Sequence, residues 1–215
     1  MSFSLNPFTL LPLSLSSTTS LLPAMVKLFS LEHTFHHPFD RVTSAFWRKY
    51  PNEAAAHVKA IDITDRRIDE QGRLITNRIM SCESNLPRWV SAAGLPSACF
   101  VAETSVVDPA AKKMVVKSSN MSGSSIMVIE ETCTYSQCPR APASATLYRQ
   151  EAKVTAFLPF ISSKFESYSL ASIQSKSKES MAVVEKLCQR IQQHGALSLL
   201  GFGTKPLAAT AAASS

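Results

Sequence analysis

The chain has 215 residues, of which 45% are hydrophobic and 18% are charged, as expected for one globular domain with a sizeable core. Its formal charge of +6 favours anionic partners such as phospholipid, nucleic acid or an acidic protein. The basic residues are scattered rather than gathered in a patch, which argues against nucleic acid. No stretch reaches the roughly 20 apolar residues of a membrane-spanning helix, so any contact with membranes is expected to be peripheral.

The two ends of the chain differ in composition from its middle. Residues 1–24 contain no charge and are rich in Ser, Leu, Thr and Pro, so we expect a disordered or targeting extension there. Residues 195–215 end in AATAAASS and are expected to form a disordered tail. The folded domain is therefore expected to span 25–194.

Seven segments have the alternation and residue types of β-strands, and turn residues separate most of them. Consecutive strands joined by short turns pair antiparallel, so one antiparallel succession is predicted. The segments are 26–36, 58–68, 73–82, 99–107, 114–120, 126–135 and 146–157.

A short helix is predicted after the first strand. It begins near Pro38, because proline suits the first turn of a helix. Phe39, Val42 and Phe46 follow at helical spacing. The helix is expected to end before Pro51, because the residue before a proline avoids the α region.

A long helix is predicted over 159–194, where an apolar i, i+3, i+4 stripe runs from Met181 to Ile191. The fold class is therefore α+β: a curved seven-stranded antiparallel sheet wrapped around a long C-terminal helix, with a short helix after strand one. A helix across the concave face of a twisted sheet leaves a cavity at one end, which we expect to be basic and partly apolar.

The segment 85–98 leaves the sheet between the third and fourth strands and is predicted to be a short helix or a loop. Trp89 in this segment either packs against the core or anchors the protein at the headgroup level of a bilayer. Five consecutive residues form the middle of this expected lid: Leu86, Pro87, Arg88, Trp89 and Val90.

Three basic residues each have two interpretations. Lys49 either offsets the dipole at the end of the short helix or points into the mouth of the cavity. Arg78, in the middle of a strand, either faces solvent or needs an anion, because a buried unpaired charge is costly. Lys164, early in the long helix, is ordinarily a solvated lysine.

No catalytic or metal site is predicted. The chain contains no nucleophile elbow, zinc-protease motif, P-loop or dinucleotide-binding motif. His33, His36 and His37 do not share one face of a strand, so no metal site is expected there. The five cysteines match no zinc spacing and are interpreted as reduced structural thiols. We therefore expect neither an enzyme nor a cofactor, and keep a hydrolase using a His and an acid as the alternative.

Short motifs along the chain match one family in order and spacing. They are MVK at 25–27, AFWRKYPN at 45–52, HV at 57–58, DxxDRRID at 62–69, GRLITNR at 72–78, LPRW at 86–89, SVVDP at 105–109 and IMVIEE at 126–131. On these motifs the chain, over 25–191, resembles the PRELI/slowmo family of phospholipid transfer proteins of the mitochondrial intermembrane space.

The resemblance implies a function and partners. It implies extraction of phosphatidic acid or phosphatidylserine and its transport between the outer and inner mitochondrial membranes, in support of cardiolipin synthesis. Within this resemblance AFWRKYPN, SVVDP and IMVIEE favour phosphatidic acid, which is the expected lipid, and SCESNLP favours the alternative, the phosphatidylserine carriers of the slowmo type. The resemblance implies two further partners, an anionic membrane surface and a small twin-cysteine helical chaperone, and it implies no cofactor. A lipid-binding scaffold that moves nothing is a further alternative.

The resemblance also implies a site. Its basic headgroup ligands fall on Lys49, Arg78 and Lys164, which would neutralise a phosphate in a dry pocket. Its lid falls on about 85–98, with membrane contact through 86–90. We expect Arg78→Glu to abolish transfer between liposomes and to leave the fold intact.

Overall fold

A computed structural model describes residues 25–83, 86–92, 94–157 and 162–194. The predictions for 1–24 and 195–215 lie outside these residues. Among the helices that the structure describes, none is both long enough and apolar enough to cross a membrane.

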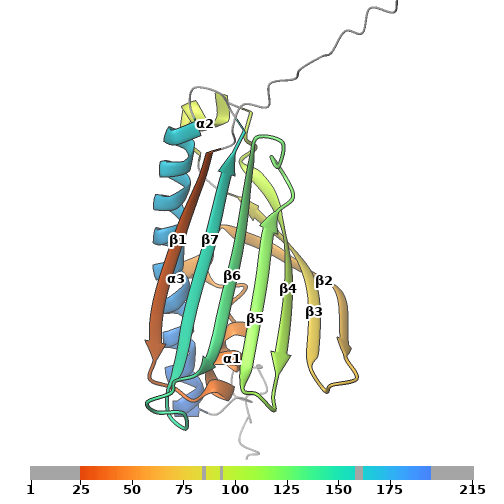
Figure 1. The fold of residues 1–215 in the computed structure, drawn as a ribbon, viewed down its shortest axis with the longest axis vertical. Coiled ribbons are helices and arrows are strands. Elements are labelled where there is room, and N and C mark those ends of the chain that lie inside the picture. The colour runs from red at the N-terminus through yellow and green to blue at the C-terminus, as the bar shows by residue number, and fades with distance from the viewer. Residues whose placement is uncertain (1–24, 84–85, 93, 158–161, 195–215) are drawn as a thin grey trace, which may run out of the picture.

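The sheet has seven antiparallel strands in the spatial order β1-β7-β6-β5-β4-β3-β2 (Figure 1). The first strand thus pairs with the last, and β1 and β2 form the two edges of the sheet. The strands are β1 (Met25–Phe35), β2 (Val58–Ile68), β3 (Leu74–Glu83), β4 (Ala98–Asp108), β5 (Lys113–Asn120), β6 (Met127–Gln137) and β7 (Thr146–Ala156). The predicted antiparallel succession is confirmed.

The helices lie on one face and at the two ends of this sheet (Figure 1). The long helix α3 (Ser162–His194) runs along β1 and β7, as predicted. The helix α1 (Phe39–Trp47) lies at one end, followed by the single turn η1 (Glu53–Ala55). The short helix α2 (Arg88–Ala92) lies at the other end, inside the segment predicted as a lid.

The helix α1 ends at Trp47, before Pro51 as predicted. The N–H of Arg48 bonds the carbonyl of Ala45 at 3.0 Å, and the N–H of Lys49 bonds that of Phe46 at 3.2 Å. These i to i−3 bonds tighten the last turn and close the helix, which leaves Lys49 outside it. The chain then turns back toward the sheet.

The main core lies between α1, the C-terminal half of α3 and the concave face of the sheet. Phe35 and Tyr148 from the sheet pack there with Phe46 of α1. The predicted stripe of α3 supplies Val184 and Leu187 to the same cluster. This packing fills one end of the space between helix and sheet, and toward the other end a cavity lies beside two smaller apolar clusters.

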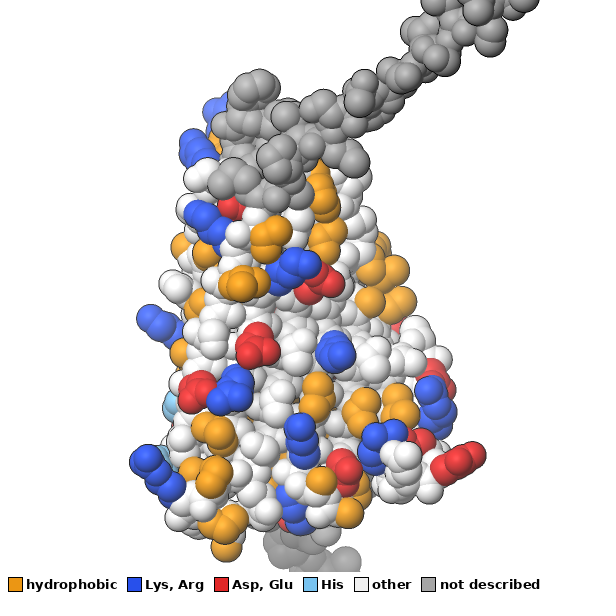
Figure 2. Space-filling model, viewed as in Figure 1, with side chains coloured by type: hydrophobic (Ala, Val, Ile, Leu, Met, Phe, Trp, Pro, Cys, Tyr) orange, Lys and Arg blue, Asp and Glu red, His pale blue; other side chains and the backbone are white. Residues whose placement is uncertain are grey.

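The convex face of the sheet carries basic and acidic side chains that are interspersed (Figure 2). Arg149 bonds Glu32 at 2.7 Å, and Lys153 pairs with Glu130 at 3.2 Å. Such exposed pairs contribute about 0–1 kcal/mol each. Among the described residues seen on this face, charges of both signs therefore lie next to one another and do not gather in a basic patch.

Candidate functional site

A cavity of about 750 Å³ lies between α3 and the strands β3 to β6. Its apolar wall includes Met80, Val101 and Ile129 from the sheet and Ile173 from α3. Val58, at the start of β2, completes this wall, and the exposed Lys59, Pro96 and Glu179 lie at its rim. The space is therefore apolar within and open to solvent at its edge.

The helix α2 and its flanks cover one end of this cavity. Val90 is fully buried and packs with Ala156 and Phe165. Its N–H bonds the carbonyl of Pro87 at 2.9 Å, which begins the helical turn. Leu86 and Val90 line the cavity, whereas Arg88 is exposed. The segment predicted as a lid therefore has apolar side chains on its inner side and Arg88 on its outer side.

Trp89 packs on the helix α3 and does not line the described cavities. Its ring lies edge-on to Phe165 at 4.9 Å and to Tyr168 at 5.6 Å between centroids. Lys164 places its Nζ 4.5 Å from the centroid of the same ring. Lys164 is exposed and lies outside the described cavities, at the lid end of α3.

The expectation of a basic lining is wrong for the large cavity. Its charged residues, among those described, are two lysines and three glutamates: Lys59, Lys176, Glu83, Glu131 and Glu179. Lys59 is already paired with Glu83 at 3.5 Å. The charges of this wall therefore nearly cancel.

A smaller, deep chamber of about 150 Å³ lies between the middle of α3 and the sheet. Lys49 is buried there, and its Nζ donates to Ser180 Oγ at 3.1 Å. Lys176 lines the same chamber, as do the carboxylates of Glu103 and Glu131. Because Tyr50 lines this chamber and the large cavity alike, the two spaces adjoin.

Part of the wall of the deep chamber is a hydrogen-bonded network. Gln150 Nε2 donates to Glu131 Oε2 at 2.9 Å, and Cys133 Sγ donates to Glu131 Oε1 at 3.3 Å. Cys133 also contacts Tyr148 Oη at 3.2 Å. Burial raises the pKa of Tyr148, so its hydroxyl stays neutral. Gln150 Oε1 is buried and has no hydrogen-bond partner among the described residues.

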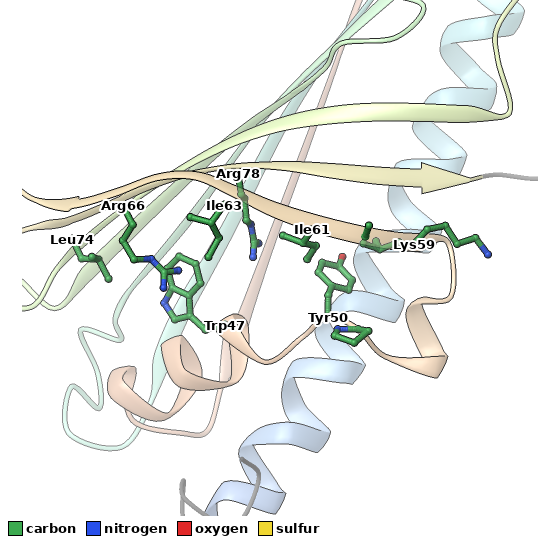
Figure 3. A pocket seen from close by; sticks show the side chains of 11 residues that line it. Trp47, Tyr50, Lys59, Ile61, Ile63, Arg66, Leu74 and Arg78 are labelled. Carbon is green, nitrogen blue, oxygen red and sulfur yellow. The ribbon is translucent and has the colours of Figure 1, made fainter. Parts of the chain in front are cut away.

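Arg78 is buried rather than solvated, and an internal carboxylate supplies its anion. Its Nε donates to Glu103 Oε1 at 2.6 Å across β3 and β4, and the two side chains are 5% and 7% exposed. Figure 3 shows Arg78 pointing from β3 toward Trp47 of α1, in a third pocket of about 560 Å³. Its Nη2 is buried and finds no hydrogen-bond partner in the described part of the chain.

Two of the three predicted headgroup ligands lie near the same aromatic ring but line different pockets, Lys49 the deep chamber and Arg78 the third pocket. Lys49 Nζ lies 5.2 Å and Arg78 Cζ 5.0 Å from the centroid of the Phe46 ring. Lys164 lies near the opposite end of the helix from this group. The missed residues are Glu103, Gln150 and Lys176; the strand alternation places the first two on the concave face, but it does not reveal their partners.

The histidines near α1 are used in structural contacts. His37 Nε2 contacts Glu185 Oε1 at 2.8 Å, and its Nδ1 lies 3.3 Å from Arg41 Nη1. The described residues include no group of three or more His, Cys, Asp or Glu side chains that could hold a metal ion.

Comparison of the sequence with known proteins gives matches over most of the chain. A model of the PRELI-like family matches residues 40–194. The UPS-like protein C36.10 of Schizosaccharomyces pombe is 33% identical over 190 residues, covering 87% of this chain and 99% of that protein. Protein UPS2, mitochondrial, of Saccharomyces cerevisiae is 33% identical, covering 79% and 77%. The slowmo homolog of Dictyostelium discoideum is 29% identical, covering 80% and 76%.

Solved structures resemble this one in fold alone. Protein TTHA0849 of Thermus thermophilus superposes with a TM-score of 0.53 at 10% identity, covering 76% of this chain and 98% of that one. The ZhuI aromatase/cyclase of Streptomyces gives the same TM-score and identity, covering 78% and 96%. The fold of sheet and long helix is therefore shared well beyond the sequence relatives.

Proposed function

This chain belongs to the PRELI-like family, and we propose that it carries one anionic phospholipid through water between the outer and inner mitochondrial membranes. The observation that supports this most is the hollow between α3 and the sheet. Its volume of about 750 Å³ lies in the usual range of about 300–1,000 Å³ for ligand sites. The apolar wall suits acyl chains, and α2 covers one end as a lid.

Two buried polar atoms, one in the deep chamber and one in the third pocket, support a headgroup site there. Arg78 Nη2 is a donor without a partner among the described residues, and Gln150 Oε1 is an acceptor that also lacks one. A buried polar group without a partner is costly. A headgroup that offers both an oxyanion and a donor would satisfy both atoms, with Lys49 and Lys176 adding positive charge.

Phosphatidic acid is the substrate that the sequence motifs favour, and phosphatidylserine is the second candidate. The charge balance of the chamber supports the second, because its three glutamates, Glu103, Glu131 and Glu179, offset its two lysines and the neighbouring Arg78, which pairs with Glu103. A bare phosphate would add negative charge that nothing compensates. The ammonium of a serine headgroup would instead find carboxylates and Gln150 Oε1 as acceptors.

We propose that the lid end of the molecule meets the membrane. Arg88 and Lys164 are exposed there, and Trp89 is a residue type that favours the headgroup level of a bilayer. In this proposal Lys164 attracts anionic lipid at the surface and meets the headgroup as it enters. Lys49 and Arg78 hold it once the lid has closed.

The remaining parts of the proposal concern where the protein works. The relative UPS2 is mitochondrial by name, which supports a mitochondrial location, and the intermembrane space is where a carrier between the two membranes has to act. Phosphatidic acid delivered inward would support cardiolipin synthesis. A small twin-cysteine chaperone would keep the free carrier soluble. The proposal includes binding and transport, and no reaction.

Lipid identification and transfer together test the proposal. Mass spectrometry of lipid that copurifies with the chain should find one phospholipid per protein, of the phosphatidic acid or phosphatidylserine class. Labelled lipid of each class should then move from donor to acceptor liposomes faster with the protein than without it. Binding without movement would make the protein a lipid-binding scaffold, and a hydrolysed product would make it an enzyme.

A further inference from the structure

Two cysteines face each other across neighbouring strands in the wall of the large cavity. Cys82 of β3 is the register partner of Cys99 of β4. Directly opposite residues of an antiparallel pair have Cα atoms about 4.5–5.5 Å apart, within the about 4.4–6.8 Å that disulfides span. Both thiols are free in the structure, and they hydrogen-bond to each other.

The other three cysteines have no such partner. Cys133 is buried against Glu131 and Tyr148. Cys188 is fully buried in the core, and Cys138 follows the end of β6. The facing pair is therefore a distinct feature of the cavity wall.

The surroundings of the pair favour reaction at Cys99. The hydrogen bond from Cys82 lowers the pKa of the Cys99 thiol to about 6, and the positive charge of Lys176 across the cavity acts in the same direction. The same hydrogen bond raises the pKa of Cys82. A thiolate is the reactive form of cysteine, and the open rim of the cavity gives small reagents a path to it.

We propose that Cys82 and Cys99 form a reversible intramolecular disulfide by exchange with a small disulfide of the glutathione type. The Cys99 thiolate attacks one sulfur of the reagent, forming a mixed disulfide and releasing one thiolate. Cys82 then loses its proton and attacks Cys99 Sγ, forming the Cys82–Cys99 bond and releasing the second thiolate. The protein loses two electrons and two protons, and the reagent gains them as two thiols.

The bond would join the strands on both sides of the lid. Cys82 lies near the end of β3 and Cys99 near the start of β4, and α2 lies on the chain between them. The bond would fix both points from which the lid is held. Resting on the proposed transport function, the further expectation is that the oxidised protein releases and takes up lipid more slowly.

Mass mapping of the wild-type chain tests the bond directly. The protein is incubated with mixtures of reduced and oxidised glutathione, its free thiols are alkylated, and it is digested with trypsin without reduction. Cleavage after Arg88 separates Cys82 from Cys99, so their bond appears as two linked peptides that lack two hydrogens. The expected result is that Cys82 and Cys99 become protected from alkylation at the same glutathione mixtures. Reduction should make both thiols available to alkylation again.

Two other results would overturn the proposal. One is that Cys82 and Cys99 stay fully alkylatable at mixtures in which Cys138 already carries glutathione. The other is a stable glutathione adduct at Cys99 with Cys82 still free. Cys138→Ser removes the thiol outside the cavity and should leave the linked peptides unchanged, whereas Cys82→Ser should abolish them.

The transfer assay then separates the formation of the disulfide from its effect on the lid. If the linked peptides form and oxidation reversibly slows transfer, both the disulfide and its effect on the lid are supported. If the peptides form and transfer is unchanged, the disulfide stands and the effect on the lid is excluded. If no transfer occurs even in the reduced protein, the proposed function fails, and the mapping result is unaffected.

Discussion

Arg78 and Glu103 form a buried ion pair across β3 and β4, with Nε and Oε1 2.6 Å apart. Glu103 thus binds the guanidinium that would otherwise be free to bind an entering phosphate. It changes the expected effect of Arg78→Glu, because that substitution would place two carboxylates side by side in a buried site. The variant is therefore expected to unfold rather than to be an intact protein without transfer.

The first prediction concerns this pair. Arg78→Met leaves Glu103 buried without its partner and should lower the free energy of unfolding by about 3–5 kcal/mol. Glu103→Leu should cost a similar amount. The double variant should be more stable than either single one, because no unpaired charge remains. Denaturant unfolding of the four proteins measures this, and simple addition of the two losses would contradict the prediction.

The second prediction concerns Lys176. Lys176→Met removes a cation that lines both the large cavity and the deep chamber. Transfer of anionic lipid should fall clearly, with little change in stability. Lys178→Met, which alters an exposed residue of the same helix outside the described cavities, is the matched control and should transfer normally. Equal transfer by the two variants would exclude Lys176 from headgroup binding.

The third prediction concerns the contact between the lid and α3. Trp89→Ala removes the edge-on ring contacts with Phe165 and Tyr168, worth about 0.5–1.5 kcal/mol each beyond buried area. Hydrogen exchange of the α2 amides should then be severalfold faster. Lys164→Gln removes only an exposed cation–π contact and should have a smaller effect. Unchanged exchange in Trp89→Ala would show that other contacts hold the lid.

The fourth prediction concerns pH. Desolvation, and then the charge of Lys176, hold the pKa of His57 below its ordinary 6.5. The unfolded chain therefore binds this proton more readily, and stability should fall as the pH drops through 6.5. His57→Gln should make the difference in unfolding free energy between about pH 7.5 and about pH 5.5 smaller. The pKa of His33 is lowered as well, so a remainder should persist.

The fifth prediction concerns Gly123, at φ +70°, beside the lid. A Cβ there would lie 2.7 Å from Leu95 Cδ2. Gly123→Ala should cost about 1–2 kcal/mol for the left-handed backbone and should also shift Leu95. Gly72→Ala is the matched control, because Gly72 has φ +75° and no atom within 4 Å of its Cβ position. Hydrogen exchange of the Gly94, Leu95 and Ser97 amides should become faster only in the first variant.

The sequence predicts the elements of this fold well because its patterns are local. Alternation in β7 and the stripe from Met181 to Ile191 depend on residues that are near in the chain. The predicted end of α1 before Pro51 is confirmed, but the bonds at Arg48 and Lys49 that close the helix at Trp47 leave no mark in residue spacing. Pairing of β1 with β7 follows from the overall topology rather than from either strand alone.

The site was less predictable, because its properties depend on partners that are distant in the chain. Arg78 could be identified as needing an anion, but Glu103 lies on another strand and no local pattern links the two. Lys176 lies in a Ser- and Lys-rich stretch that resembles a solvated face, and only the fold turns it toward the cavity. Whether a cation meets a lipid or a glutamate is decided by the three-dimensional arrangement.

The pairing of β1 with β7 also sets the order in which the domain can be assembled during synthesis. Among the described strands β1 is synthesised first, and its one neighbour among them, β7, is synthesised last. Until Thr146–Ala156 emerges, Leu31 and Phe35 lack the strand with which they pair. Pairings between segments so distant in the chain form slowly. The nascent chain should therefore depend on chaperones until translation of β7 is complete.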